Sequence, residues 1–242
     1  MILFLMGVFA VGLVSGATAG LVGFGIGSLL TPLIAAEYGM ERAVMAVSLP
    51  HLMATVFRFW RHYGHVDWGV FRKFGVWSAA GGLAGALSHR WLGGQGVTMA
   101  MGLLLLATAA ANLSSGFFGW RPRAGRTLGL LSGFFGGVAG NQGGLRACAL
   151  LICGLEPRAF LATSTAIALA VDVARTPVYL ARGWESLQGM GLTIVVASAG
   201  CVAGTALGER ILMGLGVEQY RKGVALAVGI LGIWILWNAA RS

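Results

Sequence analysis

The sequence has few charged residues for its length. Asp, Glu, Lys and Arg make up only 10% of the 242 residues, whereas 57% are hydrophobic. A soluble domain contains roughly 25% charged residues, so this composition excludes that class. The apolar runs are continuous rather than alternating, which argues against a transmembrane barrel. We therefore predict an all-α polytopic membrane protein with about eight hydrophobic segments, each near the roughly 20 residues that a spanning helix needs.

Signatures of several other protein classes are absent. No basic residue precedes Arg42, so the start lacks the n-region of a secretory signal peptide, and we expect the first apolar run to be retained. The three cysteines, Cys148, Cys153 and Cys201, lie in apolar context, which indicates buried packing residues rather than a disulfide framework or a zinc site. There is no H-E-x-x-H, G-x-S-x-G or Walker A motif. We predict no enzyme activity, no catalytic or metal-binding residues and no cofactor.

Two stretches of the chain begin alike, one at Gly20 and the other at Gly136. Each passes from a glycine-rich break through a short apolar segment to a helix rich in small residues. Duplicated halves are typical of secondary transporters. We predict a first transmembrane repeat over residues 1–118, a basic cytoplasmic linker over 119–127 and a second repeat over 128–242.

The first segment of each repeat, over residues 1–36 and 128–153, is too long for one span. Clustered glycines supply breakpoints in both segments, and Pro32 adds a second interruption in the first. Each segment forms either one long broken helix or a re-entrant hairpin buried in protein. The hairpin gathers more of the basic loop residues on one side of the membrane and makes the repeats inverted, so we favour it. Single spans are expected over residues 43–60, 69–87, 97–118, 157–180, 187–207 and 219–237.

Arg146 lies two residues after Gly144, inside an apolar run. Ionisable residues within a membrane are costly and usually functional. Arg146 binds an anionic substrate, satisfies backbone carbonyls that the helix break leaves free, or extends its guanidinium to the membrane interface. A half-helix starting at Gln142 or Gly143 would direct its N–H groups and positive end into the same cavity, and Asn141 would add an amide donor.

Other ionisable residues fall within the expected spans. Asp172 and Arg175 are three positions apart and share a helix face, either as a structural pair or as coupling and gating residues. His51 could titrate near neutral pH, although a packed structural role remains open. We expect Arg58 to reach the cytoplasmic interface with its guanidinium.

The two breaks and the helices that follow them resemble the TauE/SafE family of sulfite and organosulfur anion exporters. That family has a G-x-G-G-G-x-x-x-x-P type of break in each half, followed by a helix with a hydroxyl pair. The matching positions are Gly23, Gly25, Gly27 and Pro32 in the first half, and Thr163 and Ser164 in the second. The second break, "GNQGGLRACALL", lacks the proline, and the first-half hydroxyl pair is reduced to Ser48.

The resemblance implies a secondary transporter that moves a small anion, sulfite or an organosulfur compound, across the cell membrane with gradient coupling. We expect a multi-pass protein of the cell membrane, which is the inner membrane in a Gram-negative bacterium. Its partners would be the anion and the lipid bilayer, with a homo-oligomer left open. The net charge of +9 indicates cytoplasmic loops rather than nucleic-acid binding.

The candidate residues lie at the two breaks and on the helices that follow them. Substrate binding is assigned to Gly23, Gly25, Gly27, Ser48, His51, Gly140, Asn141, Gln142, Gly143, Gly144, Arg146, Thr163 and Ser164, and coupling or gating to Asp172 and Arg175. Two alternatives stay open: a passive channel for anions or small solutes, and a membrane partner that passes sulfur to an enzyme through Cys148 or Cys153.

Overall fold

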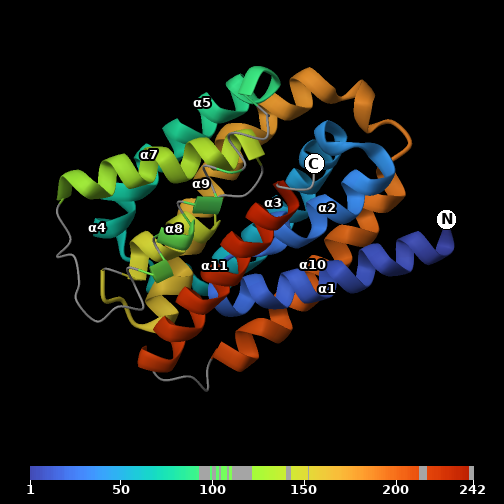
Figure 1. Cartoon of the computed structure of the whole chain (residues 1–242). Helices are drawn as coiled ribbons and strands as arrows, with labels where there is room; N and C mark the ends of the chain where they lie inside the picture. Colours follow the sequence, from blue (N-terminus) through green and yellow to red (C-terminus); the bar gives the residue numbers. More distant parts are fainter. Residues whose placement is uncertain are drawn as a thin grey trace.

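The computed structural model describes residues 1–92, 99, 102–103, 105–107, 109–110, 122–139, 143–151, 153–212 and 217–239, and all regular elements within them are helical. The α-helices are α1 (Ile2–Val22), α2 (Ile26–Tyr38), α3 (Met40–His62), α4 (Trp68–Val70), α5 (Val76–Leu92), α7 (Pro122–Ala139), α8 (Gly143–Leu151), α9 (Pro157–Gly183), α10 (Gly191–Leu212) and α11 (Val217–Ala239). Short elements are the 3-10 turns η1 (Tyr63–His65) and η3 (Glu185–Leu187) and the π-helical η2 (Phe71–Gly75). Helices α5 and α7 lie side by side on one flank of the molecule, and α1 and α10 lie side by side on the other (Figure 1).

Four helices of the described part are long and apolar enough to cross a membrane. They cover Ile2–Val22, Glu41–His65, Pro157–Ala181 and Gly191–Ile211, and shorter apolar helices cover Ile26–Tyr38 and Lys222–Asn238. The expected class, an all-helical membrane protein, is thereby confirmed. The expected number of about eight segments stays a prediction, and the span expected over 97–118 lies largely outside the described residues.

A break of three residues separates α1 from α2. Gly23 ends α1 with φ of 84°, a left-handed conformation that favours glycine, and Gly25 has φ of 134°. The rings of Phe4 and Tyr38 lie 6.0 Å apart, so α2 returns to the end of the molecule where α1 begins. The two helices therefore form a hairpin around the predicted break.

Two details of the predicted break are wrong. Pro32 lies inside the continuous helix α2 and does not interrupt it. A proline removes only one backbone donor, and the packed surroundings of α2 tolerate that loss. Gly27 lies in the first turn of α2 rather than in the break, because the backbone is already helical from Ile26.

The second half contains a similar pair of helices, α7 and α8. Helix α8 is described from Gly143, one of the two predicted starts, to Leu151, so it is shorter than α2. Pro157 occupies the first turn of α9, where its missing N–H has no helical partner to lose. Helix α7 starts at Pro122, within the stretch expected to be a linker.

Two helix pairs, α1 with α10 and α5 with α7, pack backbone against backbone. A Cβ atom on Gly16 of α1 would overlap the carbonyl oxygen of Cys201 in α10. A Cβ on Gly133 of α7 would likewise overlap the carbonyl oxygen of Ser78 in α5. Small residues permit such close approach between membrane helices, which explains much of the high glycine content.

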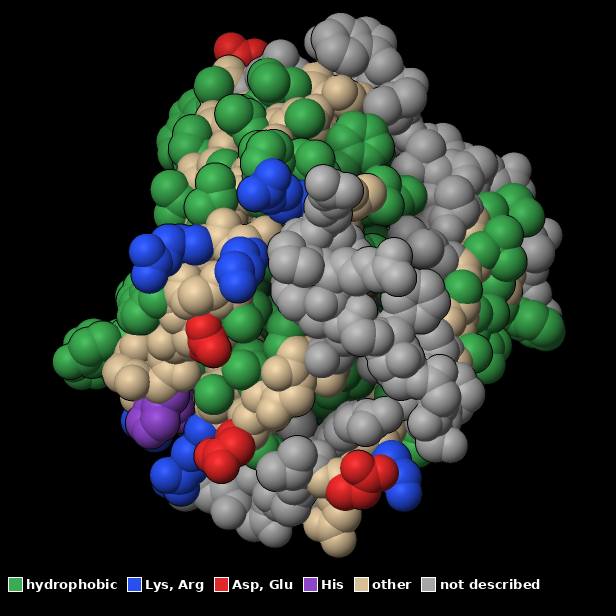
Figure 2. Space-filling view, turned by 90° about the vertical axis from the view of Figure 1, so that its left-hand side faces the viewer, with side chains coloured by type: hydrophobic (Ala, Val, Ile, Leu, Met, Phe, Trp, Pro, Cys, Tyr) green, Lys and Arg blue, Asp and Glu red, His purple; other side chains and the backbone are tan. Residues whose placement is uncertain are grey.

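Helices α3 and α9 lie between these two pairs and contact each other at the centre (Figure 1). Asp67, just after α3, donates its N–H to Thr163 near the start of α9, whereas His51 in the middle of α3 contacts Asp172 in the middle of α9. The two helices therefore run antiparallel. Figure 2 views the end of the molecule near α4 and the start of α7, where acidic, basic and histidine side chains are interspersed with apolar ones.

Candidate functional site

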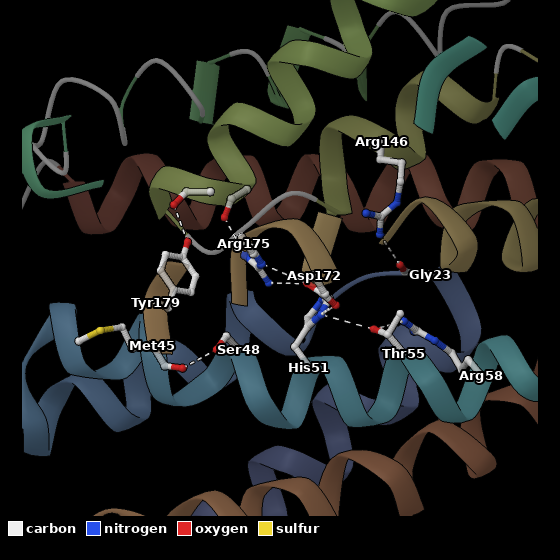
Figure 3. Close-up of polar contacts among 12 residues, drawn as sticks. Gly23, Met45, Ser48, His51, Thr55, Arg58, Arg146, Asp172, Arg175 and Tyr179 are labelled. Carbon is white, nitrogen blue, oxygen red and sulfur yellow. Dashed lines mark hydrogen bonds and ion pairs between the residues drawn. The ribbon is translucent and has the colours of Figure 1, made fainter. Parts of the chain in front are cut away.

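A buried cluster of polar residues lies where α3, α8 and α9 meet the first helix break (Figure 3). All eight acidic residues of the chain are among the described residues, and only Asp172 and Glu209 are buried. Among the arginines whose side chains the structure describes, three are buried as well: Arg58, Arg146 and Arg175. Glu209 lies outside the cluster and pairs with Arg61 at 2.7 Å.

Arg146 extends from the first turns of α8 to the break of the first half. Its Nε donates a hydrogen bond to Ser164 Oγ at 2.9 Å, and its Nη2 donates to the carbonyl oxygen of Gly23 at 3.1 Å. Its Nη1 is buried and has no hydrogen-bond partner among the described residues. Arg146 thus satisfies a carbonyl at a helix break, as one of its expected roles requires, but that carbonyl belongs to the other half of the chain.

The two helix breaks also touch each other directly. A Cβ on Gly143 would overlap the side chain of Phe24, and one on Gly23 would lie 3.1 Å from Ser164 Oγ. The start of α8 therefore packs against the residues between α1 and α2. A side chain at position 143 would push the two breaks apart. At position 23 glycine is favoured by the φ of 84° and by the closeness of Ser164 in α9.

Asp172 connects two other members of the cluster. Its Oδ2 lies 2.6 Å from His51 Nδ1, and its Oδ1 accepts from Arg175 Nε at 3.1 Å and Nη2 at 2.9 Å. Arg175 also donates through Nη1 to the carbonyl oxygen of Gly136 at 2.7 Å. The expected pairing of Asp172 with Arg175 is confirmed, and His51 is part of the same network.

Arg58 does not reach the interface, so that expectation is wrong. Its side chain is 1% exposed, and its Nη1 donates to the carbonyl oxygen of Ala19 at 2.6 Å. The Ala19 carbonyl oxygen already accepts the N–H of Gly23, which ends α1, and Arg58 is its second donor. Its Nη2 lies 3.5 Å from Thr55 Oγ1.

Several predicted site residues lie apart from this cluster or make other contacts. Ser48 donates to the Met45 carbonyl within its own helix at 2.6 Å, and Thr163 accepts the Asp67 N–H at 2.9 Å. Gly144 faces Leu105. The predicted residues Gly140, Asn141 and Gln142 lie outside the described residues.

Other polar groups near these helices were not predicted. The hydroxyls of Ser28, Thr31 and Thr165 are buried without a hydrogen-bond partner in the described part of the chain. Tyr179 donates its hydroxyl proton to the Gly137 carbonyl oxygen. The sequence signal for Thr165 was its place beside Thr163 and Ser164, whereas Ser28 and Thr31 carry no distinctive local pattern.

The cluster contains charge and hydrogen-bond donors but no assembled metal site. Within the residues that the structure describes, no three His, Cys, Asp or Glu side chains come together to hold a metal ion. Cys148 and Cys201 are buried and Cys153 is half-buried, and none of the three forms a disulfide. What the arrangement offers chemically is cationic binding of a small anion.

These features define a helical membrane protein with charged groups buried at its helix breaks. The family model for the sulfite exporter TauE/SafE matches residues 8–235, and the chain belongs to this family. No curated protein and no solved structure matches the chain. The family consists of membrane transporters, which agrees with the apolar helices.

Proposed function

We propose that this protein is a gradient-coupled secondary transporter that moves a small anion, sulfite or an organosulfur compound, across the cell membrane. The observation that carries the proposal is the charge balance of the buried cluster. Arg58, Arg146 and Arg175 are opposed by a single carboxylate, that of Asp172. Uncompensated buried charge is strongly unfavourable, so an anion that enters the cluster replaces a missing countercharge.

Arg146 is the group to which we assign the anion. Its Nη1 lacks a partner in the described structure and its Nη2 binds only a neutral carbonyl, that of Gly23. An anion can accept from both nitrogens in the bidentate geometry typical of arginine. Ser164, Gly23 and Gly143 adjoin it, and the N-terminal end of α8 adds a favourable dipole.

Repeated contacts support two structural repeats. Arg58 donates to the Ala19 carbonyl much as Arg175 donates to the Gly136 carbonyl. The second donor follows the first by 117 positions in the sequence, and so does the second acceptor. The same offset relates the starts of α2 and α8 and the starts of α3 and α9. Gly16 and Gly133, again 117 apart, make the two close backbone contacts.

The directions of the helices support inversion of these repeats. Arg58 of α3 contacts the last turn of α1, and Arg175 of α9 contacts the last turn of α7. We take α1 to run parallel to α3, and α7 to run parallel to α9. Because α3 and α9 are antiparallel, α1 and α7 point in opposite directions. Inverted repeats with broken helices at mid-depth are the usual basis of alternating access in secondary transporters.

Flux in proteoliposomes tests the proposal. The purified protein would be reconstituted, and uptake of [35S]sulfite would be measured against thiosulfate, sulfonates and carboxylates as competitors, with and without a proton gradient. Saturable sulfite exchange that an imposed gradient can drive uphill supports the transporter. If the internal sulfite concentration never rises above the external one, the protein is a passive channel. Absence of anion flux through folded protein would overturn the proposal.

A further inference from the structure

His51 is the titratable member of the buried cluster that retains an exposed edge. Its side chain is 8% exposed, compared with 0% for Asp172 and 2% for Arg175. The Nδ1 atom holds a proton, because it lies 2.6 Å from an Asp172 oxygen that can only accept. The other ring nitrogen, Nε2, is therefore the atom that gains or loses a proton when the imidazole titrates.

Asp172 is held in its charged form by its partners. Arg175 donates to Oδ1 through both Nε and Nη2, and His51 donates to Oδ2. Protonating Asp172 would leave the guanidinium of Arg175 buried without a counterion, which is strongly unfavourable. Any change of protonation in this pair therefore falls on the imidazole.

The charged groups around His51 come from three helices. Helix α9 contributes Asp172 and Arg175, and α3 itself contributes Arg58 about two turns further along. Arg146 of α8 acts on Asp172, the partner of His51. The local charge in the described structure is thus three cations and one anion when His51 is neutral.

In the part of the chain that the structure describes, the other elements that pack against α3 add no further charge at this position. On α10, Cys201 is a buried thiol 3.8 Å from Ser15 Oγ, and Glu209 lies with Arg61 near the end of α3. The titratable side chains of α2, η1 and η3 are half-buried or exposed.

We infer that His51 is the proton carrier of the transporter, and that a proton moves on His51 in the same direction as the anion. The inference rests on the proposed function. A proton on His51 adds a fourth cation to the cluster, and an anion bound at Arg146 offsets it, so each ligand favours the binding of the other. A dianion that moves with one proton carries one net negative charge, so an inside-negative membrane potential still favours its export.

The experiment compares exchange with gradient-driven uptake of [35S]sulfite in proteoliposomes. Exchange against internal sulfite at equal pH on both sides shows that the protein moves sulfite when no pH gradient drives it. Net uptake with an acid exterior reports coupling, after subtraction of entry into protein-free liposomes. The variants are His51→Asn, whose amide can replace the Nδ1 donor to Asp172, and His51→Gln as a second substitution. His65→Asn, at an exposed position in η1, is the control.

We expect an acid exterior to accelerate wild-type and His65→Asn uptake at least tenfold, and an acid interior to slow it. His51→Asn and His51→Gln should take up sulfite at the same rate with an acid exterior and with an acid interior, because neither side chain can carry the proton. An acid exterior also protonates sulfite in solution, but to the same extent for every variant. A difference between variants therefore reports proton coupling by the protein.

Three results would overturn the inference. The first is gradient-driven uptake by folded His51 variants at the wild-type rate. The second is wild-type sulfite uptake that does not change with the pH gradient, or that is faster with an acid interior; this result requires no variant. The third is wild-type protein that exchanges no sulfite at all, and that result alone also contradicts the proposed function.

Discussion

The Nη2 atom of Arg146 donates a hydrogen bond to the carbonyl oxygen of Gly23 at 3.1 Å, although the two residues are 123 positions apart. This contact joins the half-helix after one break to the backbone of the other break. It connects the two halves of the chain at the place where a charge is buried. If the halves move relative to each other during transport, this bond must be exchanged for another, and a bound anion is the natural replacement.

The buried pair of Asp172 and Arg175 predicts a specific pattern of stability. Asp172→Asn leaves Arg175 without a counterion and should lower the free energy of unfolding by about 3–5 kcal/mol. The double variant Asp172→Asn with Arg175→Gln should recover part of this loss, because both charges are then removed. Thermal unfolding in detergent measures both effects.

The control for this prediction is Glu218→Gln. Glu218 pairs with Lys222 at 3.4 Å, but both side chains are about two-thirds exposed. Such a surface pair contributes under about 1 kcal/mol, so Glu218→Gln should unfold close to the wild type. Equal effects of the Asp172 and Glu218 substitutions would contradict the buried ion pair.

The close packing of α1 on α10 predicts that Gly16 tolerates no side chain. Gly16→Ala would place a methyl group against the Cys201 carbonyl oxygen and should cost about 1–3 kcal/mol as the helices separate. Gly7, on the same helix, has open space around it, so Gly7→Ala should be neutral or slightly stabilising. The yield of monodisperse protein and the melting temperature provide the comparison, and similar behaviour of the two variants would contradict the packing.

Inversion of the repeats predicts that matching positions face opposite sides of the membrane. Glu37, near the end of α2, and Glu156, just before α9, are both exposed. In a chain whose three cysteines are replaced by alanine, Glu37→Cys and Glu156→Cys should react with a membrane-impermeant maleimide from opposite sides. Labelling of both from the same side, in sealed vesicles of known orientation, would rule out the inverted arrangement.

Local patterns in the sequence predicted the helix breaks well. Glycine clusters marked the end of α1 and the start of α8 at Gly143, because glycine alone adopts the backbone angle seen at Gly23 and permits the contact at Gly143. Pro32 was misinterpreted as an interruption, since proline costs a helix only one hydrogen bond when packing compensates for it.

The partners of the buried charges were harder to predict. The pairing of Asp172 with Arg175 follows from helical spacing, but the contact of His51 with Asp172 joins residues 121 positions apart. Arg58 lies four residues before the end of α3, where a long side chain usually reaches water. Its burial depends on the end of α1, which packs beside it, and no local pattern in the sequence reports that contact.

The central claim is that Arg146 binds the transported anion, and the most direct test measures [35S]sulfite exchange by Arg146→Gln. The matched control is Arg158→Gln, which removes an exposed arginine at the start of α9. Both proteins would first be shown to be folded and monodisperse, because Arg146 also binds Gly23 and Ser164.

Loss of a charged hydrogen-bond donor to an anion weakens binding by roughly 10- to 100-fold. We therefore predict that the sulfite concentration for half-maximal exchange rises by that factor in Arg146→Gln and stays unchanged in Arg158→Gln. Wild-type exchange and affinity in folded Arg146→Gln would contradict the account and leave Arg146 as a structural clamp on the Gly23 carbonyl.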